Sequence, residues 1–332
     1  MDSVTLDDVA RLSGVSRATA SRAINDRPGV RPDVRQRVNE IANLMGFRPN
    51  RAATNLASGR SSVIGLVIPS EELRVDPYGA SMTHAVGRVA TARDLGLMLH
   101  LAQTEPGQTV HHILRDGMID GVLVSSVAVG LPWVEELIDS PLPTVMIGTH
   151  PTREVPGVDV ENTESSAAAV AHLFEQGCQR VGLITGPLER ADARARRDGY
   201  RLAHERAGRA VDPGLIVEGD FDKAAGRSGA AELLKVGVDG IFASNDEMAI
   251  GAMWACSHSG VRIPDDVAIV GFDGTGADYW EPALTSVVQP FETIATRAVD
   301  ALVAAVDGNP LTKPVIVVPH LVEGGSSTRV TT

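Results

Sequence analysis

Residues 5–25 read TLDDVARLSGVSRATASRAIN, and this stretch decides the fold of the N-terminal part of the chain. Thr5 is of the type that caps a helix, and an apolar stripe follows it. Gly14 interrupts that stripe and supplies the backbone freedom of a tight turn, after which Ser16 can cap a second helix that runs to about Ile24. Two short helices joined by a glycine-containing turn indicate a helix-turn-helix.

A third helix is predicted from Pro32 to about Met45. Proline fits the first turn of a helix, and Gly46 is the residue type that commonly ends one. The apolar stripe of this helix consists of Val34, Val38, Ile41 and either Leu44 or Met45. The sequence therefore predicts a small all-α head of three helices.

The charge of the chain is divided unevenly along its length. The 332 residues carry a formal charge of −12, but residues 1–60 hold ten arginines against six acidic residues, which makes this part +4 and the rest −16. Such an asymmetry is expected when one end of a protein meets phosphate and the other must not. Taken alone, the charge fits an ordinary solvated arginine-rich surface equally well.

Several classes of protein are excluded by composition. Only Cys178 and Cys256 occur, without a Cys-x-x-Cys pair, so we expect neither a disulfide framework nor a metal site, and no cofactor. The N-terminus MDSVTLDDVA lacks the pattern of a signal peptide, and no stretch approaches about 18 uninterrupted apolar residues. We therefore expect a cytoplasmic protein without a membrane span.

From residue 62 onward, apolar β-branched runs alternate with helical segments, which is typical of parallel sheets covered on both faces. The predicted strands are Val63–Ile68, Ile119–Ser125, Thr144–Ile147, Val181–Ile184, Gly240–Ala243, Val267–Gly271 and Val315–Val318. The predicted helices include His84–Leu95, Ser165–Gln176, Ala193–Ala207 and Glu247–Ser259. About 270 residues of this pattern are many for one sheet, so we predict two linked α/β lobes.

The chain resembles the LacI/GalR (lac-repressor type) family of bacterial transcription regulators. The resemblance lies in the segment quoted above and in RVNEIANLMGFRPNRAATNLASGRSSVIGLVIP, followed in the body by ITGP, RRDGY, NDEMAIGAM, IPDDVAIVGFD and LTSVVQP. It implies a helix-turn-helix head over residues 1–48, a hinge helix and linker over 49–61, and a two-lobed α/β body over 62–332 that resembles type I periplasmic binding proteins. It further implies a homodimer, with higher assembly left open, that reads a pseudo-palindromic operator on double-stranded DNA.

The start of a recognition helix enters the major groove, where base edges are distinguishable. The residues in this position are Ser16, Arg17, Ala18, Thr19, Ser21 and Arg22. Arginine suits bidentate pairing with guanine, so we predict base contacts for Arg17 and Arg22, with phosphate contact as the alternative. The remaining predicted DNA contacts are Thr5, Leu6 and Asn25, with Thr5, Ser16, Thr19, Ser21 and Asn25 as phosphate anchors.

Residues from Asn50 to Ala57 read as a very short helix. About eight residues do not hold a helix alone in water, because nucleation is costly. In the family this segment pairs with its dimer mate in the minor groove, where a leucine enters the central base step. Asn50, Ala53 and Leu56 match the DNA-contacting positions, although Leu56 also fits plain linker filler.

The resemblance also points to an effector site between the lobes. It places Arg196, Asn245, Asp246 and Asp273 in the cleft, where their donors and acceptors suit a sugar. A structural ion pair between Arg196 and Asp273 is the alternative. Candidate stacking surfaces are Phe221, Tyr78, Phe291 and Trp280, for which core packing is equally plausible.

The chain departs from the family pattern at several positions. Ala20 and Ala23 replace a valine pair of the recognition helix, and Arg31 stands where a Ser or Thr cap is usual. In the body, Gly148 occupies the position of a cleft Asp and Gly324 that of a common Arg. The ligand is therefore expected to differ from those of the members that carry the cleft Asp.

We interpret the chain as an effector-responsive repressor and not as an enzyme. GFDGTG at 271–276 lies too far along the chain for a dinucleotide fingerprint, and no Gly-x-Ser-x-Gly elbow occurs. A solute-binding receptor without DNA function is the main alternative, but it leaves residues 1–60 unexplained. A sugar-processing enzyme lacks a visible catalytic constellation.

Overall fold

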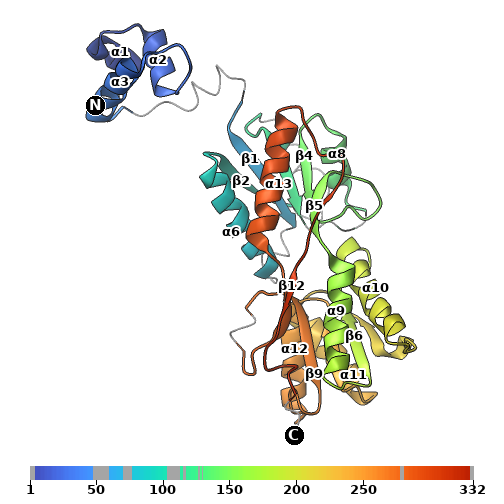
Figure 1. Cartoon of the computed structure of the whole chain (residues 1–332). Helices are drawn as coiled ribbons and strands as arrows, with labels where there is room; N and C mark the ends of the chain where they lie inside the picture. Colours follow the sequence, from blue (N-terminus) through green and yellow to red (C-terminus); the bar gives the residue numbers. More distant parts are fainter. Residues whose placement is uncertain are drawn as a thin grey trace. The chain divides into compact units, whose positions relative to one another are not determined.

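A computed structural model describes residues 4–47, 60–69, 77–102, 113–114, 117–125, 128, 130–276 and 280–329. The chain divides into two compact units, Met1–Ser61 and Ser62–Thr332 (Figure 1). The predicted contacts Asn50, Ala53 and Leu56 and the predicted hinge helix lie outside the described residues.

The first unit contains the helices α1 (Leu6–Ser13), α2 (Arg17–Ile24) and α3 (Pro32–Leu44). They enclose a small core made of Val9, Ala10, Ala20, Ala23, Val34, Val38 and Ala42. The predicted three-helix head is thus confirmed. Of the two alternatives for the last position of the apolar stripe, Met45 packs against this core and Leu44 is 87% exposed.

Local capping explains where these helices begin. Thr5 Oγ1 accepts a hydrogen bond from the Asp8 amide at 3.3 Å, and Asp8 Oδ2 accepts one from the Thr5 amide at 3.1 Å, which completes a capping box. Ser16 Oγ accepts a hydrogen bond from the Thr19 amide at 3.2 Å and so caps α2. Arg31 precedes α3 without a side-chain cap, as its residue type predicts.

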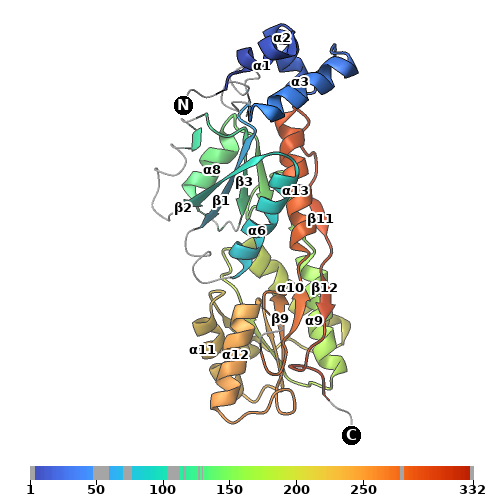
Figure 2. The same cartoon turned by 90° about the vertical axis from the view of Figure 1, so that its left-hand side faces the viewer.

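The second unit consists of two lobes, each with a six-stranded sheet. The first sheet is entirely parallel and has the order β11-β5-β4-β3-β1-β2, with β1 (Val63–Pro69), β2 (Gly96–Ala102), β3 (Gly121–Ser125), β4 (Thr144–Ile147), β5 (Gly157–Val160) and β11 (Val315–Val317). Its helices are α6 (Pro77–Ala92), α8 (Pro132–Asp139) and α13 (Phe291–Val306). Although far apart in sequence, α6 and α13 lie side by side (Figures 1 and 2).

The second sheet has the order β12-β10-β9-β8-β6-β7, and only β12 runs antiparallel to its neighbour. Its strands are β6 (Val181–Thr185), β7 (Ile216–Glu218), β8 (Gly240–Ala243), β9 (Ala268–Asp273), β10 (Thr285–Val288) and β12 (His320–Val322). The helices of this lobe are α9 (Asn162–Glu175), α10 (Ala191–Arg206), α11 (Lys223–Lys235) and α12 (Asp246–His258), with a 3₁₀ turn η1 (Pro213–Leu215). The predicted two-lobed α/β body is confirmed.

The chain crosses between the lobes three times, at residues 160–162, 288–291 and 317–320. Two of these crossings are joined, because the Glu161 amide donates to the Val317 carbonyl at 2.9 Å. In Figures 1 and 2 the lobes lie one above the other with these segments between them.

The predicted helix from His84 to Leu95 in fact begins at Pro77 and ends at Ala92. Proline at the first helical position suits this earlier start, and Asp94 with a φ of 58° follows the end. Within the part of the chain that the structure describes, no helix is long and apolar enough to cross a membrane. The same residues hold no cluster of His, Cys, Asp or Glu side chains that would bind a metal ion.

Candidate functional site

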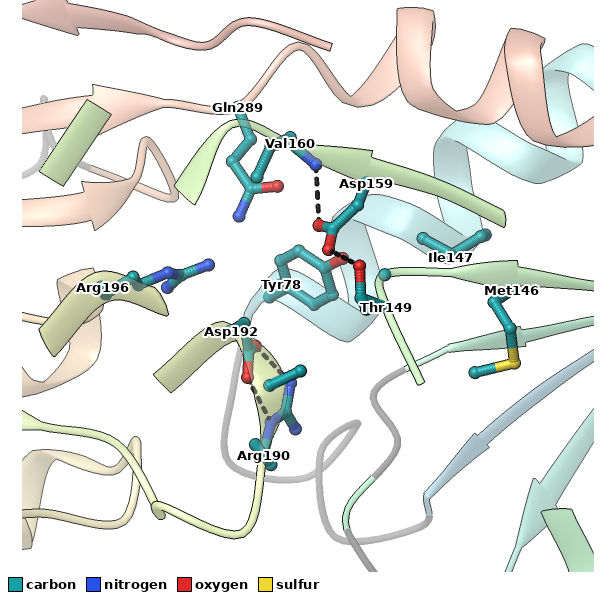
Figure 3. Close-up of a pocket in the computed structure, with 12 residues that line it drawn as sticks. Tyr78, Met146, Ile147, Thr149, Asp159, Val160, Arg190, Asp192, Arg196 and Gln289 are labelled. Atoms are coloured by element: carbon teal, nitrogen blue, oxygen red, sulfur yellow. Dashed lines mark hydrogen bonds and ion pairs between the residues drawn. The ribbon is translucent and has the colours of Figure 1, made fainter. Parts of the chain in front are cut away.

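A polar cleft lies between the two lobes, at the carboxyl ends of several strands. It is lined by Tyr78, Met146, Ile147, Gly148, Thr149, Asp159, Val160, Arg190, Ala191, Asp192, Arg196 and Gln289 (Figure 3). An adjoining pocket shares Tyr78, Arg190, Asp192 and Arg196, and adds Phe221 and Asp273. The carboxyl ends of parallel strands are where α/β folds hold ligands.

Arg196 is the most completely anchored side chain of the cleft. It is 4% exposed, Nε donates to Asn162 Oδ1 at 3.0 Å, and Nη1 donates to the Ser244 carbonyl at 2.6 Å and to Asp273 Oδ1 at 3.3 Å. Its guanidinium stacks 3.8 Å from the centroid of the Phe272 ring. Nη2 has no acceptor among the residues that the structure describes, so its two hydrogens are available to a ligand.

Asp273 completes the link between this arginine and a lobe crossing. Its Oδ1 also accepts a hydrogen bond from Gln289 Nε2 at 2.7 Å, and its backbone adopts a φ of 113°. A non-glycine residue in this region is strained, and strain of this kind clusters at ligand sites. The buried ion pair with Arg196 is present, so the structural alternative holds, yet the pair also lines the cleft.

Gly199 allows α10 to approach α9 closely enough for Arg196 to reach Asn162. A Cβ at position 199 would lie 2.3 Å from the Thr163 carbonyl oxygen and 2.7 Å from Ser166 Cβ. Backbone atoms do not yield at such distances, so the glycine of the RRDGY motif is a packing requirement.

We expect Gly199→Ala to lower the free energy of unfolding by about 1–3 kcal/mol, because α10 must move away from α9. Urea unfolding followed by tryptophan fluorescence measures this change. The matched control is Gly87→Ala in α6, where the nearest atom to a new Cβ is Leu97 Cδ2 at 3.7 Å. Equal unfolding midpoints for the two variants would contradict the packing argument.

Arg190 and Asp192 form a bidentate pair at the start of α10. Nε donates to Oδ1 at 3.1 Å and Nη2 donates to Oδ2 at 2.7 Å, and the Arg190 guanidinium lies 5.0 Å from the centroid of the Phe221 ring. Burial raises the pKa of Asp192, but the charge and hydrogen bonds of Arg190, aided by the charge of Arg196, outweigh it and hold that pKa well below its usual range. Asp192 is therefore ionised.

Asp159 supplies a carboxylate from the first lobe. Oδ2 accepts a hydrogen bond from Thr149 Oγ1 at 2.7 Å, and Oδ1 accepts from the Val160 amide at 2.7 Å and from Asn162 Nδ2 at 3.2 Å. Burial raises the pKa of Asp159, and the negative charge of Asp192 raises it further, while the hydrogen bonds from Thr149 and Val160 oppose the shift.

Two contacts bridge the lobes beside the cleft. Arg194 Nη2 of the second lobe donates to the Pro151 carbonyl of the first lobe at 3.1 Å. Ala128 of the first lobe pairs with Arg190 as an isolated antiparallel bridge. These two contacts join the lobes in addition to the three crossings.

Asn245 and Asp246 line neither pocket. Asn245 Oδ1 caps α12 by accepting from the Met248 amide at 2.9 Å, and its Nδ2 donates to the Phe221 carbonyl at 2.8 Å. Asp246 accepts hydrogen bonds from Ser286 Oγ at 2.6 Å and from the Thr275 amide at 2.7 Å. Asn245 therefore caps a helix, and Asp246 binds the Thr275 amide of the GFDGTG motif.

The predicted stacking residues separate into two groups. Tyr78 lines both pockets and Phe221 lines one of them. Phe291 packs against the Tyr78 ring with centroids 5.5 Å apart and lines neither pocket. Trp280 lines a separate surface groove with Trp254, away from the cleft. Of these four aromatic residues, Tyr78 and Phe221 line the two described pockets.

The two glycine departures in the body have different causes. Gly324 is required, because a Cβ there would lie 2.4 Å from the Ala283 carbonyl oxygen. Gly148 has a φ of 100°, and a Cβ there would meet nothing within 4 Å. Position 148 therefore leaves open space at the edge of the cleft, next to Thr149.

The head presents a polar face on α2. Arg17, Ala18 and Arg22 are exposed, and Arg17 makes only a long ion pair of 3.6 Å with Asp7. Arg22 has no hydrogen bond or ion pair to any residue that the structure describes. These guanidinium groups are free to bind DNA.

Other predicted contacts of the head have structural roles as well. Thr5 and Ser16 are the caps described above, and Thr19 Oγ1 lies 2.9 Å from Ser16 Oγ. Asn25 Nδ2 donates to the Ser21 carbonyl at 2.8 Å, and Leu6 is half-buried against the head core. A cap residue at a helix start still exposes its hydroxyl, so these roles do not exclude phosphate contact.

Comparison with known proteins agrees with this arrangement. Residues 5–50 match the family model described as bacterial regulatory proteins, lacI family, and residues 170–327 match that of a periplasmic binding protein-like domain. The chain is 31% identical to catabolite control protein A of Priestia megaterium, over 98% of this chain and 99% of that protein. The chain belongs to the lacI family.

Two solved structures are similar to this lacI-family chain over nearly its whole length. The transcriptional regulator CelR in complex with cellobiose has a TM-score of 0.74 at 31% identity, covering 97% of this chain and 99% of that one. The lac repressor dimer bound to operator and the anti-inducer ONPF has a TM-score of 0.81 at 25% identity, covering 99% and 100%. The lacI-family chain is a DNA-binding transcriptional regulator that responds to an effector, and not an enzyme.

Sequence reasoning missed several residues that line the cleft of this lacI-family chain, namely Thr149, Asp159, Arg190, Asp192 and Gln289. It also missed Asn162, which joins Arg196 to Asp159. A signal existed for two of them, because Asp159 and Gln289 lie at the carboxyl ends of β5 and β10. Neither β5 nor β10 was predicted from the sequence, so ligand-binding residues were not sought at the carboxyl ends of these strands.

Proposed function

We propose that this lacI-family chain is a repressor that binds a pseudo-palindromic operator as a homodimer and responds to a sugar-like effector in the cleft between its lobes. The observation that carries the DNA-binding part is the exposed face of α2, where Arg17 and Arg22 are available on a head of charge +4. Arginine at the start of a recognition helix suits bidentate contact with guanine. A target on DNA also supports a cytoplasmic location.

The proposed division of labour follows the chain. Residues 1–48 read DNA, 49–61 form a hinge with Asn50, Ala53 and Leu56 at the DNA, and 62–332 bind effector and dimerise. The lac repressor structure, a dimer on its operator, supports this assignment. We assign DNA contact to Thr5, Leu6, Ser16, Arg17, Ala18, Thr19, Ser21, Arg22 and Asn25.

The proposed effector site comprises Arg196, Asp273, Asp192, Asp159, Gln289, Tyr78 and Phe221. Arg196 offers donors, the carboxylates accept, and Gln289 does both, which suits a polyhydroxylated ligand. The relative CelR, solved with cellobiose, supports a sugar. Effector binding changes the angle between the lobes through the crossings and shifts DNA affinity by an expected 1–3 kcal/mol.

Selection from random duplex DNA by the purified full chain tests the proposal. We expect enrichment of a single sequence with two related half-sites, and two protomers per duplex by analytical ultracentrifugation. Binding should weaken steeply as salt rises, because phosphate contacts release counterions. A pool without enriched sequence after repeated rounds would contradict the proposed function.

A further inference from the structure

The cleft carries an excess of negative charge. Its described lining includes three carboxylates, Asp159, Asp192 and Asp273, against two guanidinium groups, Arg190 and Arg196. Each guanidinium already has a carboxylate partner, since Arg190 binds Asp192 at 2.7 Å and Arg196 binds Asp273 at 3.3 Å. The arginines are therefore compensated before any ligand enters.

Asp159 is the carboxylate left over. Its hydrogen-bond partners are a hydroxyl, an amide nitrogen and a side-chain amide, and none of the described basic side chains forms an ion pair with it. It comes from the first lobe, and Asp192 comes from the second lobe to line the same pocket (Figure 3). Burial and the charge of Asp192 raise the pKa of Asp159, while the hydrogen bonds from Thr149 and Val160 and the charge of Arg196 lower it, with a net rise.

An incoming group must satisfy both this carboxylate and the free donors nearby. A carboxylate accepts hydrogen bonds, and Arg196 Nη2 offers two hydrogens from a side chain that is 95% buried. A hydroxyl group of a ligand can donate a hydrogen bond to the Asp159 carboxylate and accept one from Arg196 Nη2. A phosphate or carboxylate group accepts only, so near Asp159 it brings like charge and no donor.

Position 148 adds room next to this carboxylate. Gly148 has no side chain, a Cβ there would meet nothing within 4 Å, and its amide donates to the Val158 carbonyl at 2.8 Å, one residue before Asp159. Space at the cleft edge thus adjoins Thr149 and the Asp159 carboxylate that it binds.

We propose that Asp159 is a specificity-determining residue of the effector cleft, whose carboxylate accepts hydrogen bonds from hydroxyl groups of an uncharged effector and excludes phosphorylated and carboxylated sugars. The inference rests on the proposed function, in that it takes the cleft to be the effector site. It names the chemical class that the cleft admits, which is a neutral polyhydroxyl compound.

Matched pairs of sugars test this selectivity. Thermal shift and calorimetric titration of the full chain compare cellobiose, glucose and ribose with glucose 6-phosphate, ribose 5-phosphate and glucuronate. We expect binding only from neutral members. Asp159→Asn should lower the affinity for the neutral compound that binds best by roughly 10- to 100-fold, as expected for a lost hydrogen bond to a charged group. Asp198→Asn, an exposed aspartate of α10 outside the pockets, should leave it unchanged.

Two results of that titration overturn the proposal. One is a phosphorylated or acidic sugar that binds more tightly than its neutral parent. The other is an Asp159→Asn variant that binds the best neutral compound within twofold of the parent chain. If no sugar of either kind binds, the proposal that the effector is a sugar fails. The proposed role of the Asp159 charge is then tested by measurements on the ligand-free protein.

The ligand-free measurement uses inorganic phosphate and the melting temperature. Asp159→Asn should raise Tm near neutral pH by roughly 1–3 °C, because it removes one of two like charges that line the same pocket, the other being Asp192. Phosphate should give no stabilisation beyond a sodium chloride control of equal ionic strength. A lower Tm for Asp159→Asn, or a phosphate stabilisation that Arg190→Gln abolishes, overturns the inference.

Discussion

Replacing Arg196 by alanine is expected to destabilise the body by about 3–5 kcal/mol and to abolish effector binding. The substitution leaves Asp273, whose side chain is 3% exposed, without its cationic partner, and breaking a buried pair from one side has a cost of this size. It also removes the hydrogen bonds to Asn162 and to the Ser244 carbonyl, which tie α10 to a lobe crossing and to β8.

Urea unfolding and titration with the neutral sugar that binds best measure the two effects. Arg197→Ala is the matched control. Arg197 is the neighbour of Arg196 on α10, and its ion-pair partner is the partly exposed Asp198. Arg196→Lys keeps the positive charge but loses the planar guanidinium. We therefore expect the lysine variant to be more stable than the alanine variant and still to bind the effector poorly. An alanine variant with a loss below about 1 kcal/mol and unchanged affinity would show that Arg196 is dispensable.

Arg17→Ala and Arg22→Ala are each expected to weaken operator binding by about 1–3 kcal/mol, which is roughly 5- to 150-fold. Neither side chain supports the folded head, since Arg17 is 70% exposed and Arg22 has no partner within the described part of the chain. Base contact and phosphate contact make different predictions. Loss of a base contact relaxes specificity at one position, whereas loss of a phosphate contact weakens all sequences alike.

Fluorescence anisotropy with the selected operator and with single-base variants separates these outcomes. Arg37→Ala provides the control, because it removes one positive charge from an exposed position of α3 rather than α2. The three variants lower the charge of the head equally. If Arg37→Ala weakens binding as much as Arg17→Ala and Arg22→Ala, then α2 has no special role in recognition.

The head was predictable from its sequence because its signals are local. Thr5, Gly14 and Ser16 occupy the cap and turn positions that their residue types favour, and the structure confirms the helices that they delimit. The buried strands β4 and β8 were predicted to the residue, since each is an uninterrupted apolar run. Half-exposed or very short strands such as β2 and β7 give no such run.

The cleft was only partly predictable because residue type does not reveal what a side chain binds. Asn245 lies just after β8 and Asp273 is the last residue of β9, but the Asn245 side chain caps α12 whereas Asp273 pairs with Arg196. Asp159 and Asp192 become neighbours of one pocket only through the packing of two lobes. Contacts between segments distant in sequence leave no local pattern.

Coupling between the cleft and the DNA-binding head is tested most directly by the affinity of the full chain for its selected operator. Operator affinity is measured with and without the saturating neutral sugar, and sugar affinity is measured with and without operator. We expect each ligand to change the affinity for the other by the same factor, between about 5- and 150-fold, because coupling free energy is reciprocal. Operator and sugar affinities that are each independent of the other ligand would contradict it.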